Sequence, residues 1–491
     1  MASTRLPAPK ARLFYGSEAA CDKRVRLVPR TGWHGNVFVL PNATYGASEE
    51  VYRYAGDARG VLYGQKGTLD EWRTEIAAKA SGNSRLILTM SLAFSGPIFD
   101  LLESEAIGAH LMGGSSIGKT TVTLAAGSVW GGGGRNGFAQ SWRATSNGLE
   151  GIAKAHSGTL LNLEEIGEMD GREIGSVAYM LLNGHGKGRA TKDGEAKARA
   201  EWRVPILSSG ELGIADKIRE GRRGVRQGQL IRIIDLPADA GKGLGVFEET
   251  HGAGAAEFAN ALKAAALRYY GTAGDAFLRE ITENVDEVRD YISRRVQALM
   301  RAWGTDSADG QVSRVARRLA IVAASGELAR DALDLPWGED EVETAVQTCF
   351  SAWLERRGGA GAGEITAAIE RLQSIIETHG ESRFLSLDDF DKVIEPRIPV
   401  RDLLGYRLGE GDALIWAFTE SAWKETLQGV GDLRFIEREL HRRGIIQVTP
   451  SQLQQRRFRF AKKIKGRSCR LAAVCAAMLF DEGDDPKQTS F

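Results

Sequence analysis

The residues best suited to chemistry form one glycine-rich run that ends in a lysine and two hydroxyl side chains: Gly113-Gly114-Ser115-Ser116-Ile117-Gly118-Lys119-Thr120-Thr121. Its first eight residues fit the phosphate-loop pattern G-x-x-x-x-G-K-[ST] at every fixed position. Glycines let the backbone turn so that successive N–H groups face a phosphate, and a following helix adds the positive end of its dipole. Lys119 would reach the β- and γ-phosphates of ATP, and the Thr120 hydroxyl would bind Mg²⁺. The alternative is an ordinary glycine-rich turn.

Two adjacent carboxylates, Glu164 and Glu165, end the next apolar strand pattern at 159–164. In ATP hydrolysis such a pair has two jobs: one carboxylate binds the hydrated Mg²⁺ and the other polarises the attacking water. We assign Glu164 to the metal and Glu165 to the water. The carboxylate that binds the metal in such pairs is more usually Asp. Glu164 departs from this pattern, and its longer side chain would give a less favourable metal geometry. An exposed acidic strand end is the alternative.

The predicted strand at 203–208 also ends in small hydroxyl side chains. A polar group there would lie between the γ-phosphate and the catalytic carboxylate and could report hydrolysis. This sensor role is open to Ser208, our first choice, or to Ser209. The alternative is an ordinary cap of the helix that follows.

Arginines follow at two places. Arg222 and Arg223 precede a predicted strand, and in a ring ATPase an arginine at this point projects into the neighbouring subunit's site. There it would stabilise charge on the transferring phosphoryl group. Arg314, Arg317 and Arg318 lie on a predicted helix, from which one of them could reach the nucleotide as part of a lid. A solvated basic loop is the alternative for the first group.

A glycine-rich insertion at 184–199 carries the basic residues Lys187, Arg189 and Lys192. It lies between the carboxylate strand and the sensor strand, where ring helicases place a hairpin that faces the central pore. A flexible basic loop can grip the phosphate backbone of single-stranded DNA without reading bases. A solvated surface loop is the alternative, and the DNA surface would then lie elsewhere, most plausibly in the basic stretch at 456–463.

The overall composition is that of an ordinary globular protein. The chain has 491 residues, 43% of them hydrophobic and 26% charged, which is enough for two to four domains. Lys+Arg and Asp+Glu both number 64, so any nucleic-acid-binding surface must be local. The four cysteines are far apart and form no C-x-x-C pair, which suits a reducing cytoplasm. The most apolar stretch, 86–102, is short and interrupted, so we expect no membrane span.

Alternating patterns between 105 and 240 predict a parallel sheet with crossover helices. The predicted strands are 108–112, 137–143, 159–164, 203–208 and 229–236, and the predicted helices are 119–129, 146–156, 172–182 and 212–220. Helical periodicity then dominates, in the segments 258–270, 275–303, 311–332, 339–357 and 364–379.

The two ends of the chain differ from this central part. Near the N-terminus we predict strands at 24–28 and 37–40 around a turn at 32–36, a capping box at Thr68–Glu71, and a buried helix pair at 84–102. Near the C-terminus a helix at 432–443 precedes a strand pair around 445–449 and 457–461, the order of a winged helix. We therefore divide the chain into a small β-rich region (1–65), an ATPase core (66–245), a helical domain (246–385) and a winged-helix-like domain (386–491).

The sequence resembles the P-loop proteins of prophages, plasmids and integrative elements, long catalogued as a domain of unknown function and often labelled helicase-like. The similarity lies in the runs 84–97, 114–121, 141–150, 228–232 and 323–329. This resemblance implies an α/β fold of AAA+ type with a helical lid, a hexameric ring, and action on single-stranded DNA. Relatives often carry a primase module upstream, and no primase-like stretch is present here.

The function predicted from these features is an ATP-driven hexameric helicase or translocase that serves replication of a mobile element, with ATP and Mg²⁺ as cofactors. Three other classes stay open. These are a ring ATPase that remodels proteins, a nucleotide-gated switch with poor turnover, suggested by Glu164, and a scaffold that recruits a primase or polymerase.

Overall fold

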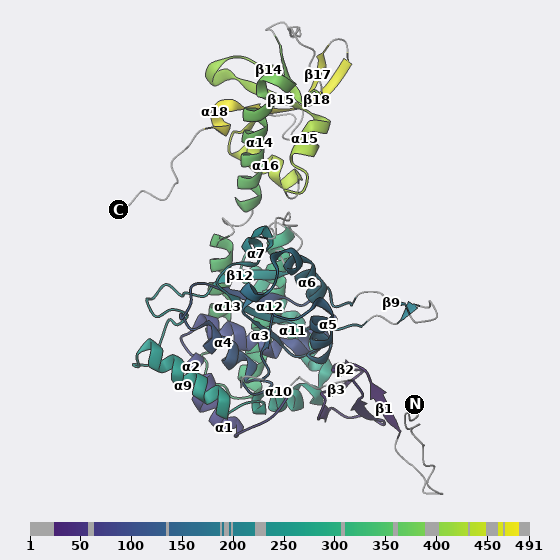
Figure 1. The fold of residues 1–491 in the computed structure, drawn as a ribbon, viewed down its shortest axis with the longest axis vertical. Helices are drawn as coiled ribbons and strands as arrows, with labels where there is room; N and C mark the ends of the chain where they lie inside the picture. The colour runs from purple at the N-terminus through teal and green to yellow at the C-terminus, as the bar shows by residue number, and fades with distance from the viewer. Residues whose placement is uncertain are drawn as a thin grey trace, which may run out of the picture.

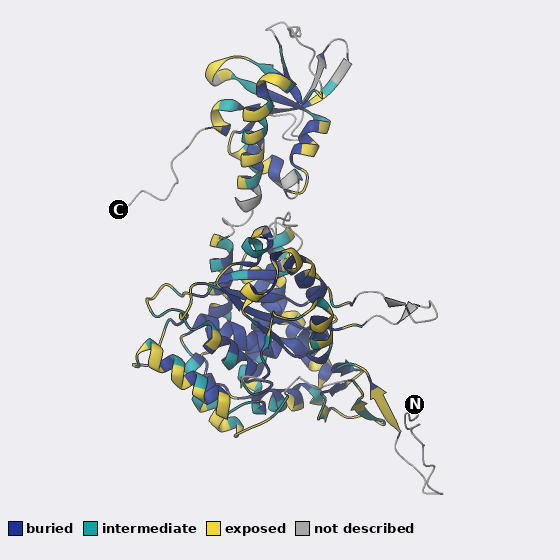
Figure 2. Cartoon of the chain, viewed as in Figure 1, coloured by how far each residue is buried: buried dark blue, intermediate teal, exposed yellow. Residues whose placement is uncertain are grey.

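The computed structural model describes residues 24–56, 63–133, 137–186, 189–190, 196–197, 200–220, 232–305, 310–356, 362–387, 402–430, 433–447, 460–464 and 467–480. These residues form an α/β body and a smaller C-terminal unit of helices and strands (Figure 1). Buried side chains gather inside each of the two parts (Figure 2). Within the ranges just given, no helix is both long and apolar enough to cross a bilayer.

The N-terminal residues form two small sheets. One pairs two strands in parallel, and the other is an antiparallel meander of three short strands. The strands predicted at 24–28 and 37–40 are confirmed, whereas the turn predicted at 32–36 is partly wrong, because its first three residues form a strand. The strands are β1 (Val25–Val28), β2 (Gly32–His34), β3 (Val37–Val39), β4 (Thr44–Tyr45) and β5 (Val51–Tyr54).

A capping box begins the first helical segment, as predicted. The Thr68 hydroxyl accepts from the Glu71 backbone N–H at 3.2 Å, and the Glu71 carboxylate accepts from the Thr68 N–H at 2.8 Å. Because both free N–H groups are satisfied, the helix has a defined start. The segment comprises α1 (Leu69–Trp72), η1 (Arg73–Ala77) and α2 (Ala78–Ala80).

The predicted helix pair at 84–102 is instead one helix, α3 (Ser84–Leu101), with Pro97 inside it. A proline cannot donate to the carbonyl four residues earlier, here that of Ala93, and this loss usually ends or kinks a helix. The Ala93 carbonyl accepts a hydrogen bond from Trp130 Nε1 at 3.0 Å instead. The helix continues because a distant side chain replaces the missing backbone donor, and every one of its residues is buried.

The central sheet has the strand order β12-β6-β11-β8-β7, and every pairing in it is parallel. This confirms the parallel sheet, although the strand predicted at 137–143 shrinks to two residues. The strands are β6 (Gly108–Met112), β7 (Gln140–Ser141), β8 (Leu161–Glu164), β11 (Ile206–Gly210) and β12 (Ile233–Pro237). The crossover helices are α4 (Lys119–Gly127), α5 (Ser146–Ala155), η2 (Ile166–Glu168), α6 (Gly171–Asn183) and α7 (Ile214–Glu220).

Successive side chains of these strands pack into two different cores, as expected of a sheet covered on both faces. Ala109, Leu111 and Leu207 face the core built by α3, α4 and the later helices. Leu161, Leu163 and Ile206 face the core built by α5, α6 and α7. The parity of a residue on its strand therefore decides which of the two faces it reaches.

Among the helices that follow the sheet, α12 and α13 pack against α3, α9 packs against α4, and α11 packs against α12. The single helix predicted at 275–303 is wrong, because Asn284 interrupts it and caps the second of two helices by accepting from the Glu287 N–H. The helices are α9 (Ala255–Arg268), α10 (Thr272–Glu283), α11 (Val285–Ala302), α12 (Gly310–Ala332), α13 (Glu341–Arg356) and α14 (Ala362–Arg383).

The C-terminal unit has its own apolar core, which includes one side of α14. The strands predicted around 445–449 and 457–461 do not pair with each other. Both pair with β18 (Arg467–Cys475), whose nine residues are long enough to accept one strand at each end of the same edge. The other elements are β13 (Phe384–Ser386), β14 (Gly405–Leu408), η3 (Gly411–Ala413), β15 (Ile415–Thr419), α15 (Glu420–Thr426), α16 (Leu433–Arg442), β16 (Ile446–Gln447), β17 (Phe460–Ile464) and α18 (Ala476–Leu479).

Candidate functional site

The glycine-rich run forms the loop between β6 and α4, where three residues have a left-handed backbone. Gly113, Ser116 and Gly118 have φ of 155°, 63° and 101°. A Cβ on Gly118 would lie 2.6 Å from a side-chain carbon of Val246, so both the backbone and the space require glycine there. No side chain caps the start of α4. The first N–H groups of that helix therefore remain available to an anion.

Lys119 folds back onto its own loop. Its Nζ donates to the Gly113 and Gly114 carbonyls, each at 2.6 Å. The loop is thus closed by the lysine that the motif assigns to the β- and γ-phosphates. A bound phosphate would compete with these two carbonyls for the ammonium group.

The two carboxylates at the end of β8 point to different surroundings. Glu164 lies on the α4 face, where its Oε1 accepts from the Thr123 hydroxyl at 2.7 Å. Thr123 follows Thr120, the residue whose hydroxyl is predicted to share the metal, by three positions on α4, so the two lie on the same side of the helix. Glu165 is exposed and has φ of 56°, a strained value for a glutamate that turns the chain away from the strand.

Burial raises the pKa of Glu164, and the neighbouring Glu165 acts in the same direction. The Thr123 hydroxyl and the ammonium of Lys263 oppose the shift. Lys263 lies on α9, and its proximity to Glu164 was not foreseen from the sequence, because the two residues are almost a hundred positions apart.

A cavity of about 680 Å³ opens beside the loop. It is bounded by the phosphate loop, the start of α4, the end of β8, the loop before α9 and one face of α9. The lining residues with polar or charged side chains are Ser115, Ser116, Lys119, Thr120, Thr121, Glu165, Glu211, Asn260 and Lys263. The structure therefore brings residues 115–121 of the predicted loop and Glu165 to one cavity.

Ser208 lies on the other face of the sheet. Its hydroxyl accepts from Trp142 Nε1 and lies 2.8 Å from His110 Nδ1, while His110 Nε2 lies 2.8 Å from the Leu212 carbonyl. A carbonyl only accepts, so Nε2 carries the proton and Nδ1 accepts from Ser208. Burial, the largest cause, lowers the pKa of His110, which keeps the ring neutral as this chain of bonds requires. Ser209, the alternative sensor, lies on the same face as Glu164.

The other predicted residues lie away from the cavity or outside the described residues. Arg222, Arg223, Lys187 and Lys192 are outside them. Only the backbone of Arg189 is described, in the short pair β9 (Arg189–Ala190) and β10 (Ala196–Lys197).

Arg318, one of the three lid candidates, is ion-paired with Glu105, just before β6. That position is at the amino end of the strand, opposite to the phosphate loop. Arg318 is therefore not the candidate that reaches the phosphate loop of the same chain, and the lid role stays a prediction for Arg314 or Arg317.

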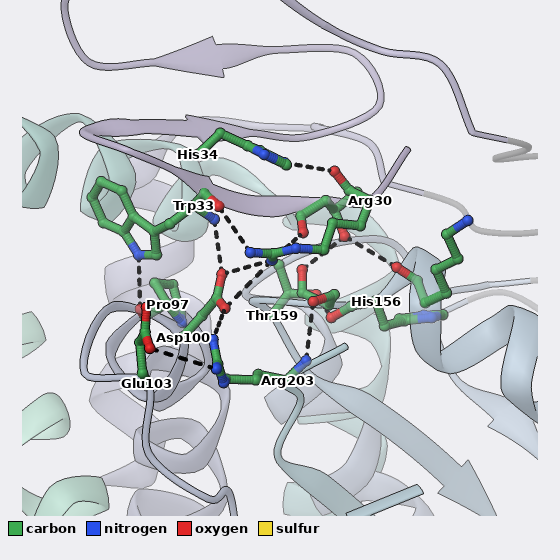
Figure 3. A network of polar contacts seen from close by, with 12 residues as sticks. Arg30, Trp33, His34, Pro97, Asp100, Glu103, His156, Thr159 and Arg203 are labelled. Atoms are coloured by element: carbon green, nitrogen blue, oxygen red, sulfur yellow. Dashed lines mark hydrogen bonds and ion pairs between the residues drawn. The ribbon is translucent and has the colours of Figure 1, made fainter. Parts of the chain in front are cut away.

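A second polar cluster lies at the amino ends of the central strands, opposite to the phosphate loop (Figure 3). The Asp100 side chain is only 1% exposed; its carboxylate accepts from the Trp33 N–H at 2.8 Å and pairs with Arg30 at 3.1 Å and Arg203 at 3.5 Å. Arg203 lies directly after the segment that carries β9 and β10, and its N–H donates to Ser157. The cluster ties the N-terminal strands to α3 and to the start of β11.

Comparison with known proteins agrees with these features. Residues 10–201 match the family described as "Domain of unknown function (DUF927)". The DUF927 match includes the N-terminal strands, the phosphate loop and both carboxylates, and it ends just before β11.

The fold extends beyond the DUF927 segment. A solved structure titled "SCCmec type IV Cch - active helicase" is similar to the chain with a TM-score of 0.64 and 17% sequence identity. The match covers 92% of this chain and 80% of that one. A search of curated proteins finds no match to the sequence. The fold of the chain, a parallel five-stranded sheet with a helical region, is therefore similar to the fold of that structure.

Proposed function

We propose that this protein is an ATP-hydrolysing ring motor of AAA+ type that moves on single-stranded DNA during replication of a mobile element. The observation that carries the proposal is the cavity in which the phosphate loop, Thr120 and Glu165 meet. Strand β11 lies between the loop strand β6 and the carboxylate strand β8, so the polar end of β11 lies between the phosphate site and the carboxylates.

The donor groups at this site fit Mg²⁺, which prefers oxygen ligands and retains several waters. Thr120 supplies a hydroxyl, and Glu164 and Glu165 supply carboxylates. To reach the metal from its present position, Glu164 would leave the Thr123 hydroxyl. The ion would neutralise charge on the β- and γ-phosphates.

The roles of the protein groups follow from their positions. The N–H groups of the loop and of α4 bind the phosphates, and Lys119 exchanges two loop carbonyls for phosphate oxygens. Glu165, exposed to the cavity, accepts a hydrogen bond from the attacking water. Ser209 lies on the Glu164 face and is better placed than Ser208 to contact the γ-phosphate. Ser208 then supports the site by linking β11 to β6 through His110.

Ring assembly would complete the site with a neighbour's arginine. Arg222 and Arg223 lie outside the described residues, between α7 and β12 in the sequence. We assign the arginine that serves a neighbour to this pair. Turnover per subunit should therefore rise with protein concentration as rings assemble.

The DNA contacts are assigned to the hairpin of β9 and β10, which carries Lys187, Arg189 and Lys192. Figure 1 shows β9 outside the packed body. A segment that contacts single-stranded DNA must extend from the surface in this way. In the C-terminal unit, α14 is followed by β13, β14 and β15, then by α15 and α16, and then by β16, β17 and β18. The pair of helices between strands is similar to that of a winged helix, although the described sheet has six strands. A winged helix suits contact with DNA or with a partner such as a primase or polymerase.

The deciding experiment measures ATP hydrolysis with and without single-stranded DNA, together with strand displacement on a forked duplex. We expect DNA to stimulate hydrolysis in the parent. The Lys187→Ala/Arg189→Ala/Lys192→Ala variant should keep basal turnover, lose the stimulation and show a flatter salt dependence of binding. Slow hydrolysis that DNA does not change would identify a nucleotide-gated switch. Stimulation by an unfolded protein and not by DNA would identify a remodelling ATPase.

A further inference from the structure

The charge balance of the cavity favours a second cationic side chain beside Lys119. Among the residues that the structure describes around it, Lys119 and Lys263 are positive, and Glu165 and Glu211 are negative. Fully ionised ATP carries about four negative charges near the two carboxylates, and Mg²⁺ with one lysine neutralises about three of these. Lys263 is the remaining described cation on the cavity wall.

Helix α9 presents Lys263 to the cavity by its periodicity. Ala255, Ala259 and Lys263 are spaced four residues apart and share one face of the helix. All three line the cavity, while Phe258 and Leu262 on the other side enter the apolar core. The alanines leave room for a ligand, and the lysine places a charge at one end of that face.

The position of Lys263 identifies which end of the nucleotide it would meet. Lys263 lies on α9, which packs against α4, the helix that begins with Lys119 and Thr120. It shares the cavity wall with Glu165, the group assigned to the attacking water. Since that water attacks the γ-phosphorus, this end of the cavity is the γ-phosphate end.

We propose that Lys263 is a second phosphate-binding residue of the same subunit and that it contacts the γ-phosphate of ATP. This inference depends on the proposed ATP site. Lys119 is close to the β- and γ-phosphates, whereas Lys263 meets the γ-phosphate alone. The protein therefore distinguishes ATP from ADP within one subunit, independently of any arginine supplied by a neighbour.

The test is equilibrium binding of ADP and of the β,γ-imido analogue of ATP, each with Mg²⁺, measured by calorimetry at a concentration where the parent is monomeric. The Lys263→Met variant keeps the length of the side chain and removes its charge. It should bind the ATP analogue about 10- to 100-fold more weakly, the value of one charge-assisted contact, and ADP within about 3-fold of the parent. Lys263→Arg should recover most of the affinity.

Arg268→Met is the matched control, because Arg268 is an exposed cation on the same helix that does not line the cavity. It should bind both nucleotides as the parent does. Equal weakening of ADP and the analogue by Lys263→Met, or no weakening of either, would overturn the inference, and retained ADP binding shows that the variant is folded. A parent that binds neither nucleotide would instead refute the proposed function.

Discussion

At the carboxyl ends of the central strands, Lys119, Glu165 and Lys263 line a cavity without a described ion pair between them, whereas at the amino ends Asp100, Arg30 and Arg203 line a smaller cavity of about 390 Å³ and bind one another. The two groups lie at opposite ends of the strands of one sheet, and we call these ends the first edge and the second edge. At the first edge, the described contact of Lys119 is with loop carbonyls that a ligand can replace. At the second edge, a carboxylate that is almost completely buried is held by two guanidinium groups and a backbone N–H.

This difference separates ligand binding from stability. Charges that a ligand must approach are held by groups that the ligand can replace, since each bond within the protein would have to be broken on binding. Charges that join distant segments are paired within the protein, here through the buried Asp100 carboxylate, and removing one of them leaves its partners unsatisfied. Substitutions at the first edge should therefore change binding or turnover, and substitutions at the second should change the free energy of unfolding.

The largest effect is expected for Lys119→Ala. Removing the ammonium takes away the charge at the β- and γ-phosphates, so ATP binding should become at least about 100-fold weaker. The melting temperature without nucleotide should stay close to that of the parent. Calorimetric titration and thermal unfolding measure the two quantities. Lys424→Ala, in the surface pair with Glu420 on α15, is the control. Near-parental affinity of the Lys119 variant would refute the phosphate-site assignment.

Glu165→Gln should keep ATP binding and lose turnover by about 100- to 10,000-fold, because an amide is a far weaker base than a carboxylate. Glu164→Gln should instead raise the Mg²⁺ concentration needed for half-maximal hydrolysis. Steady-state hydrolysis over a Mg²⁺ series separates the two effects. If Glu164→Gln is the more damaging change at saturating Mg²⁺, the two roles are exchanged.

Asp100→Ala should produce the opposite pattern. It leaves Arg30, Arg203 and the Trp33 N–H without their shared acceptor, at a cost of about 3 kcal/mol in the free energy of unfolding. The denaturation midpoint should fall, while the protein that remains folded binds ATP with parental affinity. Asp286→Ala removes an exposed carboxylate and should change neither quantity. A loss of ATP affinity in Asp100→Ala without a loss of stability would contradict the separation of the two edges.

The smallest effect is expected from acid, through His156, which lies beside the amino-end cluster (Figure 3). Burial lowers the pKa of His156 to about 4. The unfolded chain therefore takes up the proton first, and stability is lost as the pH falls from about 6.5 towards about 4. By pH 5.5 the loss should be about 1.4 kcal/mol. His156→Gln should flatten the dependence of the unfolding midpoint on pH between 7 and 5, and an unchanged slope would contradict this account.

The sequence determined those features whose signal lies within a few adjacent residues. The phosphate loop, the Glu164–Glu165 pair and the Thr68 capping box depend on short-range geometry, because each is built from a turn, a strand end or the first turn of a helix. The strand β6 was also predicted with its observed bounds. These features were visible because the groups that make them are neighbours along the chain.

Only the tertiary structure decided which distant groups meet. Pro97 breaks no helix because Trp130 reaches the Ala93 carbonyl, and Lys263 joins the cavity because α9 packs along α4. Alternate side chains of β11 point to opposite faces of the sheet, and Ser208 is on the face of His110. The local sequence does not show which of the two serines faces the phosphate site, since both end the same strand. The residue type at one position does not reveal which distant segment will contact it. This holds whether the distant segment supplies a hydrogen-bond partner, a neighbouring charge or an apolar side chain. Those contacts became visible only when the chain was folded.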